Sequence, residues 1–126
     1  MMYGPERLIT DLQALEFEVS EVIVPSGERF AVLTGFTVPG GRFNGRVIDL
    51  GIQTTPDFPR TVSSAIHVKA NPQLYDVVDT APKVRNITES VLGPEWRYWS
   101  NNFQWTEERS ARRLLSQING IFDRAE

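Results

Sequence analysis

Cysteine is absent from the 126 residues of this chain. Its absence excludes disulfide bonds, thiolate zinc sites and every mechanism that uses a cysteine nucleophile. Histidine is nearly absent too: His67 stands alone, which disfavours a histidine-rich metal site and leaves a single candidate base for a serine–histidine triad. We therefore expect no metal and no cofactor.

Long apolar runs and an excess of positive charge are missing as well. The chain begins MMYGPERLITDL, which has no signal-peptide pattern, and no stretch approaches the roughly 20 apolar residues of a membrane-spanning helix. The formal net charge of −3 provides no basic field for nucleic acid. We expect a single domain over residues 1–126, located in the cytoplasm and bound to neither membrane nor nucleic acid.

The first predicted element is a short amphipathic helix over about residues 5–15. Pro5 occupies a first-turn position, where its missing N–H is tolerated. Leu8, Leu12 and Leu15 recur at helical spacing and form one apolar face, which we expect to be buried.

The clearest predicted element is a C-terminal helix over about residues 107–123. Thr106 is a suitable N-cap, and Glu107 and Glu108 suit the positive end of the helix dipole. An apolar stripe follows at helical spacing, and we expect it to pack on a sheet. The stripe consists of Leu114, Leu115, Ile118, Ile121 and Phe122.

Between these helices the apolar period changes to two, which predicts β-strands. Turn sequences separate four expected strands at about residues 17–24, 29–38, 42–54 and 64–70. No helical crossover interrupts them, so the sheet should be an antiparallel meander in an α+β fold. Residues 71–95 show no steady period and contain three prolines, so we expect a long irregular loop over the sheet.

All three tryptophans of the chain fall within the segment EWRYWSNNFQW, residues 95–105. Aromatic side chains dominate core packing, so the segment could be a hydrophobic anchor beneath the loop. Alternatively, these side chains could wall in the hydroxyl of Ser100, at the centre of the segment. The sequence leaves both interpretations open.

Four motifs, in their order along the chain, resemble the ubiquitin-conjugating (UBC-like) fold. GRFNG at 41–45 resembles the Gly-x-Phe segment that opens the third strand of that family, and TPDFP at 55–59 resembles its P-x-x-Y-P corner. NPQ at 71–73 stands where the family has His-Pro-Asn, and ERSARRLLSQINGIF resembles the helix that follows its active site. The resemblance implies a UBC-like fold: an N-terminal helix, a four-stranded antiparallel meander, a long irregular loop and a C-terminal helix packed on the sheet.

The active-site cysteine of the family has no counterpart here, and the resemblance implies a serine in its place. Trp105 resembles the tryptophan that follows that cysteine, so Ser100 takes the position of the nucleophile, with Ser90 and Thr88 as alternatives. The segment WRYWS is also similar to UBC-like proteins of bacterial operons that encode ubiquitin-like proteins, activating enzymes and peptidases. One branch of those systems uses an oxyester on a reactive serine, and the implied setting extends to anti-phage defence.

A serine hydroxyl is a weak nucleophile, so the implied reaction needs a base and hydrogen-bond donors for a tetrahedral oxyanion. Gln73, Asn101 and Asn102 carry amide groups that could donate to that oxyanion. His67 could serve as the base or could point into the core.

Two functions follow from the resemblance. The first is a conjugating enzyme that carries the C-terminus of a ubiquitin-like modifier on Ser100 and transfers it to an amine. The second is a catalytically inactive UBC-like or RWD-like adaptor, because most members of the fold without the cysteine are inactive. The implied partners are a ubiquitin-like modifier, an activating enzyme and a peptidase of the same operon. By the resemblance, the activating enzyme would meet Glu6, Arg7, Asp11 and the turn at 25–28.

Overall fold

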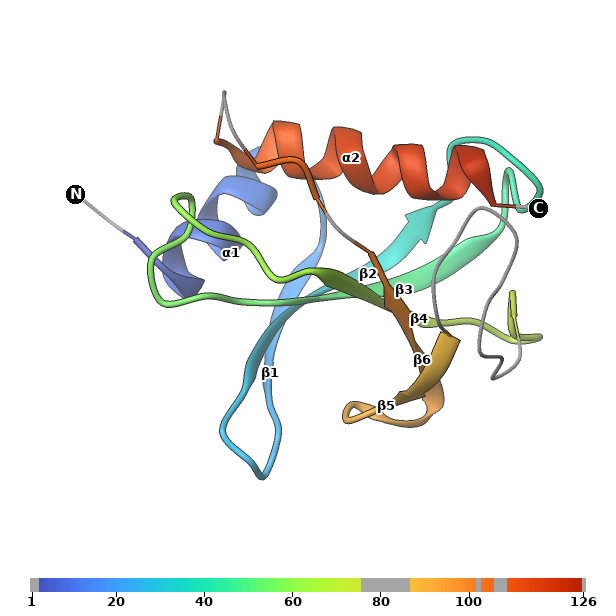
Figure 1. Ribbon diagram of the computed structural model, residues 1–126, viewed down its shortest axis with the longest axis horizontal. Helices are drawn as coiled ribbons and strands as arrows, with labels where there is room; N and C mark the ends of the chain where they lie inside the picture. Colours follow the sequence, from blue (N-terminus) through green and yellow to red (C-terminus); the bar gives the residue numbers. More distant parts are fainter. Residues whose placement is uncertain (1–2, 76–86, 102, 106–108, 126) are drawn as a thin grey trace.

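The computed structural model describes residues 3–75, 87–101, 103–105 and 109–125. Helix α1 (Pro5–Ala14) comes first and helix α2 (Ala111–Arg124) comes last. Between them are β1 (Val19–Ile23), β2 (Arg29–Thr37), β3 (Val47–Gln53), β4 (Ala65–Lys69), β5 (Ile87–Ser90) and β6 (Gly93–Ser100). Both helices lie on one side of the sheet (Figure 1). No helix in the described part of the chain is long and apolar enough to cross a membrane.

The N-terminal helix begins and ends close to the predicted residues. Pro5 stands in its first turn, and the backbone N–H of Leu15 closes its last turn. Leu8 and Leu12 are buried in the core, as their spacing predicts. The prediction of a short amphipathic helix is confirmed.

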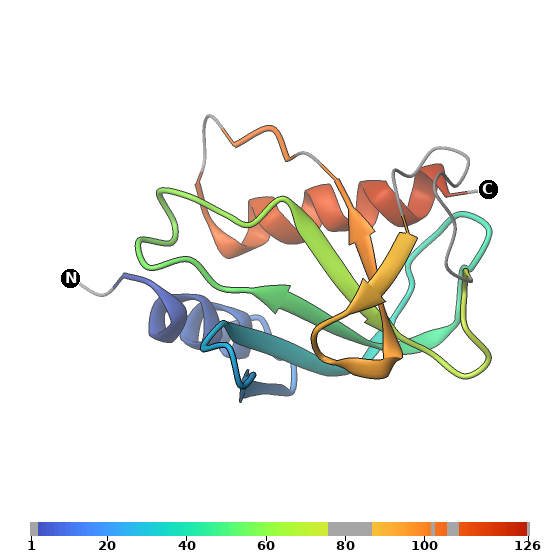
Figure 2. The ribbon, with the colours of Figure 1, turned by 60° about the horizontal axis from the view of Figure 1, so that its bottom comes forward.

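The sheet is antiparallel throughout, with strand order β1-β2-β3-β4-β6-β5. The meander of the first four strands is confirmed, but the prediction of four strands is wrong, because the sheet has six (Figure 2). Strand β5 and the first residues of β6 occupy part of the segment that was expected to be a loop. Large aromatic side chains point to both faces of β6, so the sequence has no apolar–polar alternation there to reveal a strand.

Helix α2 begins later than its sequence predicts. The observed N-cap is Ser110, whose hydroxyl accepts a hydrogen bond from the backbone N–H of Arg113 at 3.2 Å. The predicted cap, Thr106, and the two glutamates after it lie outside the described residues. Serine is at least as good an N-cap as threonine, and Ser110 lies nearer to the apolar stripe than the predicted Thr106.

The apolar stripe of α2 packs on the sheet, as predicted. All five of its residues are buried, and they join α1 and one face of the sheet in a single core. Trp99 of β6 enters this core and packs against Phe122, with ring centroids 5.4 Å apart. Because alternate residues of a strand face opposite sides, Ser100 and Tyr98 belong to the other face.

That second face carries a smaller apolar cluster without any helix. Phe30 and Val32 of β2 are buried there beneath Leu92 and Trp96, which belong to the β5–β6 turn and to β6. Gly51 of β3 lies at the centre of the contact. The β5–β6 hairpin therefore supplies part of the cover that a second helix layer would otherwise provide.

Candidate functional site

Ser100 is the last residue of β6 and pairs with Ala65 of β4. It is half-buried, and its hydroxyl makes no side-chain interaction with any residue that the structure describes. Trp99 points into the core, so the Ser100 side chain points to the opposite face. The predicted nucleophile is thus a strand-end hydroxyl that is not already engaged by a neighbour.

The three tryptophans pack at three separate places, two of them on the main core and one on the second face of the sheet. Trp99 is completely buried beneath α2, whereas Trp96 covers the second face of the sheet. Trp105 donates its indole N–H to the carbonyl of Pro59 at 2.7 Å, at the TPDFP corner. The aromatic segment is therefore three packing anchors along one stretch of chain, not a single enclosure around Ser100.

The predicted oxyanion donors do not all lie near Ser100. Asn101 follows it directly, and its backbone N–H donates to the carbonyl of Ser64 at 2.8 Å. Asn102 lies outside the described residues. Gln73 is at the other end of β6, where its Nε2 donates to the carbonyl of Glu95 at 2.6 Å.

The separation between these ends follows from strand geometry. Glu95 and Ser100 are five residues apart on an extended strand, which corresponds to about 17 Å. The Nε2 of Gln73 is occupied by the backbone, and its Oε1 is buried without a hydrogen-bond partner among the described residues. Gln73 therefore presents an acceptor, and it lines a pocket to which Ser100 does not contribute.

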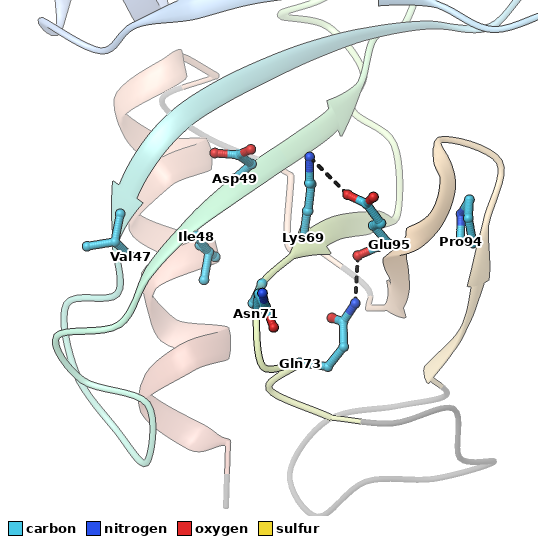
Figure 3. A pocket seen from close by; sticks show the side chains of 9 residues that line it. Val47, Ile48, Asp49, Lys69, Asn71, Gln73, Pro94 and Glu95 are labelled. Atoms are coloured by element: carbon cyan, nitrogen blue, oxygen red, sulfur yellow. Dashed lines mark hydrogen bonds and ion pairs between the residues drawn. The ribbon is translucent and has the colours of Figure 1, made fainter.

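That pocket has a volume of about 670 Å³ and lies among the ends of β3, β4 and β6 (Figure 3). Lys69 projects across it and forms an ion pair with Glu95, with Nζ 3.2 Å from Oε2. Asp49 lines the same pocket and accepts a hydrogen bond from the backbone N–H of Gly35 at 3.2 Å. The carboxylates and amides that line this pocket were not predicted as a group, because they come together only through the pairing of β3, β4 and β6.

A second pocket, of about 380 Å³, lies between α2 and the chain after Ser100. Asn101 lines it, together with Arg113 and Arg124 of α2. Gln117 holds its wall in place: its side-chain amide accepts from the backbone N–H of Gln104 at 2.8 Å and donates to the carbonyl of Gln104 at 2.7 Å. This reciprocal pair fixes the described part of the post-Ser100 segment against α2.

His67 faces the second side of the sheet and contacts Ser90. Its Nδ1 lies 2.7 Å from the Ser90 hydroxyl, and its ring lies edge-on to Phe30 and Tyr98. The residue is 3% exposed, and this burial lowers the pKa of His67 to about 4. Ser100 is a diagonal neighbour on the same face, a relationship that places Cα atoms about 7–8 Å apart, but the ring is directed to Ser90.

No group of three or more histidine, aspartate or glutamate side chains comes together as a metal site within the described residues. The groups available at these sites are hydroxyls, amides, one neutral imidazole, the carboxylates and lysine of the larger pocket, and surface arginines. Such groups suit acyl transfer through an oxygen nucleophile, and they equally suit protein binding without catalysis.

Comparison with known proteins identifies one family. The model of the prokaryotic E2 family E matches residues 8–125, which is nearly the whole chain. No curated protein and no solved structure matches.

Proposed function

Because this chain belongs to the prokaryotic E2 family E, we propose that it carries the C-terminus of a ubiquitin-like modifier as an oxyester on Ser100 and transfers it to an amine. An E2-like protein of a bacterial conjugation system has a ubiquitin-like modifier and an activating enzyme as its partners. The absence of cysteine from the sequence carries the oxyester proposal. An E2 that transfers an acyl group must hold it on a nucleophile, and here only an oxygen or nitrogen nucleophile exists.

The surroundings of Ser100 support its role as that oxygen. Its hydroxyl is half-buried and not engaged by a described side chain, so an acyl carbonyl can approach it. The attack converts the carbonyl into a tetrahedral oxyanion, which needs preorganised donors. Asn101 and Asn102 are the proposed donors, and Gln73 could join them only if the chain moved by about the length of five strand residues, ~17 Å.

The proposal extends to the biological setting. Residues 1–126 would act as one UBC-like domain in the cytoplasm, in a pathway that also includes a peptidase and serves anti-phage defence. These statements rest on the resemblance of the aromatic segment to proteins of such operons.

The decisive experiment is incubation with the activating enzyme, the ubiquitin-like protein and ATP. An oxyester adduct should survive thiol reductants and be lost to hydroxylamine or mild alkali, whereas an isopeptide would resist both treatments. Ser100→Ala should abolish the adduct on the tryptic peptide of residues 98–109, which contains Ser100, and Ser100→Cys should convert that adduct into a reductant-sensitive thioester. Thr88→Ala is the matched control, because it removes a hydroxyl from the neighbouring part of the sheet.

A second candidate function is that of a non-catalytic adaptor. It is favoured by the absence, among the described residues, of any basic side chain in contact with the Ser100 hydroxyl. An adaptor would bind the modifier or the activating enzyme and form no adduct. Undiminished binding of the modifier without any adduct, in wild type and in Ser100→Cys, would assign this function.

A further inference from the structure

His67 and Ser90 are 23 positions apart in the sequence, and their side chains meet although they belong to β4 and β5, which are not neighbours in the sheet. Strand β6 lies between β4 and β5, so His67 must reach past β6 to meet Ser90. The register of β5 and β6 makes this possible: Glu89 pairs with Arg97, but the next residue, Ser90, pairs with Gly93. At this irregularity three residues of β6 have no partner on β5, and such irregularities redirect side chains.

The hydrogen bonds around the Ser90 hydroxyl determine its orientation. The backbone N–H of Leu92 donates to the Ser90 oxygen at 3.1 Å, which occupies one lone pair. The hydroxyl proton is then free to point at Nδ1 of His67, 2.7 Å away. Because burial keeps the imidazole neutral near pH 7, Nδ1 can accept that proton while Nε2 carries the ring hydrogen, and Nε2 is buried without a hydrogen-bond partner among the described residues.

The distance between Ser90 and His67 meets one geometric requirement for an activated serine, although no described residue bonds to Nε2 of His67 as the third group of a triad would. A nucleophile and its base should lie within hydrogen-bond reach, about 2.6–3.2 Å apart. One lone pair of the Ser90 oxygen remains for attack on a carbonyl. Ser90 is half-buried and precedes the turn of the hairpin, where the next residue, Val91, is 59% exposed. The rings of Phe30 and Tyr98 enclose the base on its other sides.

We propose that Ser90 is a second acyl-accepting nucleophile of this protein, with His67 as its general base, and that its substrates are activated acyl groups. As the Ser90 oxygen bonds to the acyl carbon, its proton passes to Nδ1 of His67 and then to the leaving group, whose bond to that carbon breaks. When an amine later attacks the ester, Nδ1 of His67 takes a proton from the amine and passes it to the Ser90 oxygen as the bond between that oxygen and the acyl carbon breaks. The nature of the natural acyl group, a modifier C-terminus, rests on the proposed function; the reactivity of the pair does not.

The test uses the isolated chain and an alkyl fluorophosphonate, which reacts with base-activated serines by losing fluoride. Trypsin separates the two candidate serines, because cleavage after Arg85, Arg97 and Arg109 gives a peptide of residues 86–97 with Ser90 and one of residues 98–109 with Ser100. We expect the phosphonate on the first peptide, with fragmentation placing it on Ser90. Labelling confined to the second peptide, or no labelling at all, would overturn the proposal, and this mapping requires no variant.

Variants then assign the base. Ser90→Ala should abolish labelling of the 86–97 peptide, whereas the matched Thr88→Ala variant should label at the wild-type rate. His67→Asn places an amide where Nδ1 stands, so it can keep a hydrogen bond to Ser90 but cannot take its proton. We expect His67→Asn to slow labelling by about 10²-fold or more, the usual contribution of a general base. An unchanged rate in His67→Asn, with thermal unfolding showing a folded protein, would show that Ser90 is not activated by His67.

Failure here and failure of the proposed function are distinguishable. The fluorophosphonate experiment contains neither modifier nor activating enzyme, so it reports on the pair alone. Conversely, a modifier adduct that survives Ser90→Ala and is lost in Ser100→Ala would leave the oxyester function intact and assign it to Ser100.

Discussion

Trp96 lies against Gly51, so closely that a Cβ atom at position 51 would be 3.3 Å from its Cζ3. The same Cβ would lie 2.9 Å from a methyl group of Leu92 and 3.3 Å from Cβ of His67. The β5–β6 hairpin therefore depends on bare backbone at position 51 to reach the second face of the sheet. This contact leads directly to a test of how that face is covered.

Gly51→Ala should destabilise the protein by about 1–3 kcal/mol, because it inserts a methyl group into a packed contact. Gly120→Ala is the matched control: its Cβ would meet only the tip of the flexible Arg124 side chain, at 3.0 Å, in a helix. Alanine is favoured over glycine inside a helix by about 1 kcal/mol, so this variant should be neutral or stabilised. Urea unfolding of both variants measures the difference, and equal stability would mean that the hairpin does not press on Gly51.

His67 predicts a pH dependence of stability. Its pKa is lowered by burial from 6.5 to about 4, so the unfolded chain binds a proton in a range where the folded protein does not. The contribution of neutral His67 to the free energy of unfolding is complete above pH 6.5. It is lost as the pH falls toward 4, and the loss is at most about 3 kcal/mol. Unfolding should be compared in wild type and His67→Asn between pH 7 and pH 4. The excess loss in wild type is the contribution of His67, and parallel curves would contradict a neutral buried imidazole.

Leu114 tests the core beneath α2. It is completely buried, so Leu114→Ala should cost about 2–5 kcal/mol, as large-to-small core substitutions do. Arg112→Ala, on the exposed side of the same helix, should change the unfolding free energy by less than about 0.5 kcal/mol. Chemical denaturation measures both. A small effect at Leu114 would mean that α2 does not pack on the sheet in solution.

Arg7 tests the predicted surface for the activating enzyme. Its Nε lies 2.6 Å from Oδ2 of Asp11 on α1, and the two side chains are 31% and 30% exposed. Arg7→Glu replaces a partly exposed ion pair with a repulsive one, which should cost less than about 1 kcal/mol of stability. Loading by the activating enzyme should nevertheless slow, because the surface charge is reversed. Arg112→Glu on α2 is the control, and equal loading of both variants would move the interface elsewhere.

The helices and the first four strands could be predicted because their signals are local. The helical spacing of Leu8 and Leu12, and of the apolar stripe of α2, is enough to predict which face of each helix is buried. Strand β6 could not be found this way, because Trp96 and Trp99 are apolar residues that serve opposite faces. The start of α2 was predicted too early, because Thr106 is a suitable N-cap but the observed cap is Ser110.

The candidate site was harder to predict because it depends on which strands are neighbours. Placing Gln73 near Ser100 followed from family resemblance, but the length of β6 separates them in this structure. The contact between His67 and Ser90 could not be found from spacing, since it requires the order β4-β6-β5 and the irregular register at Ser90. The sequence identified both residues as candidates separately, without a reason to join them.

The chain that leaves Ser100 is tethered at three points, two on the connection between β3 and β4 and one on α2. Asn101 is bonded to Ser64, Gln104 to Gln117 of α2, and Trp105 to Pro59. An acyl group on Ser100 would therefore be attached to a backbone that is held in place, and movement of the strand end could not carry it toward an acceptor. The reach needed for transfer would have to come from the modifier's own tail or from the acceptor, so the length of that tail would govern which amines can be modified.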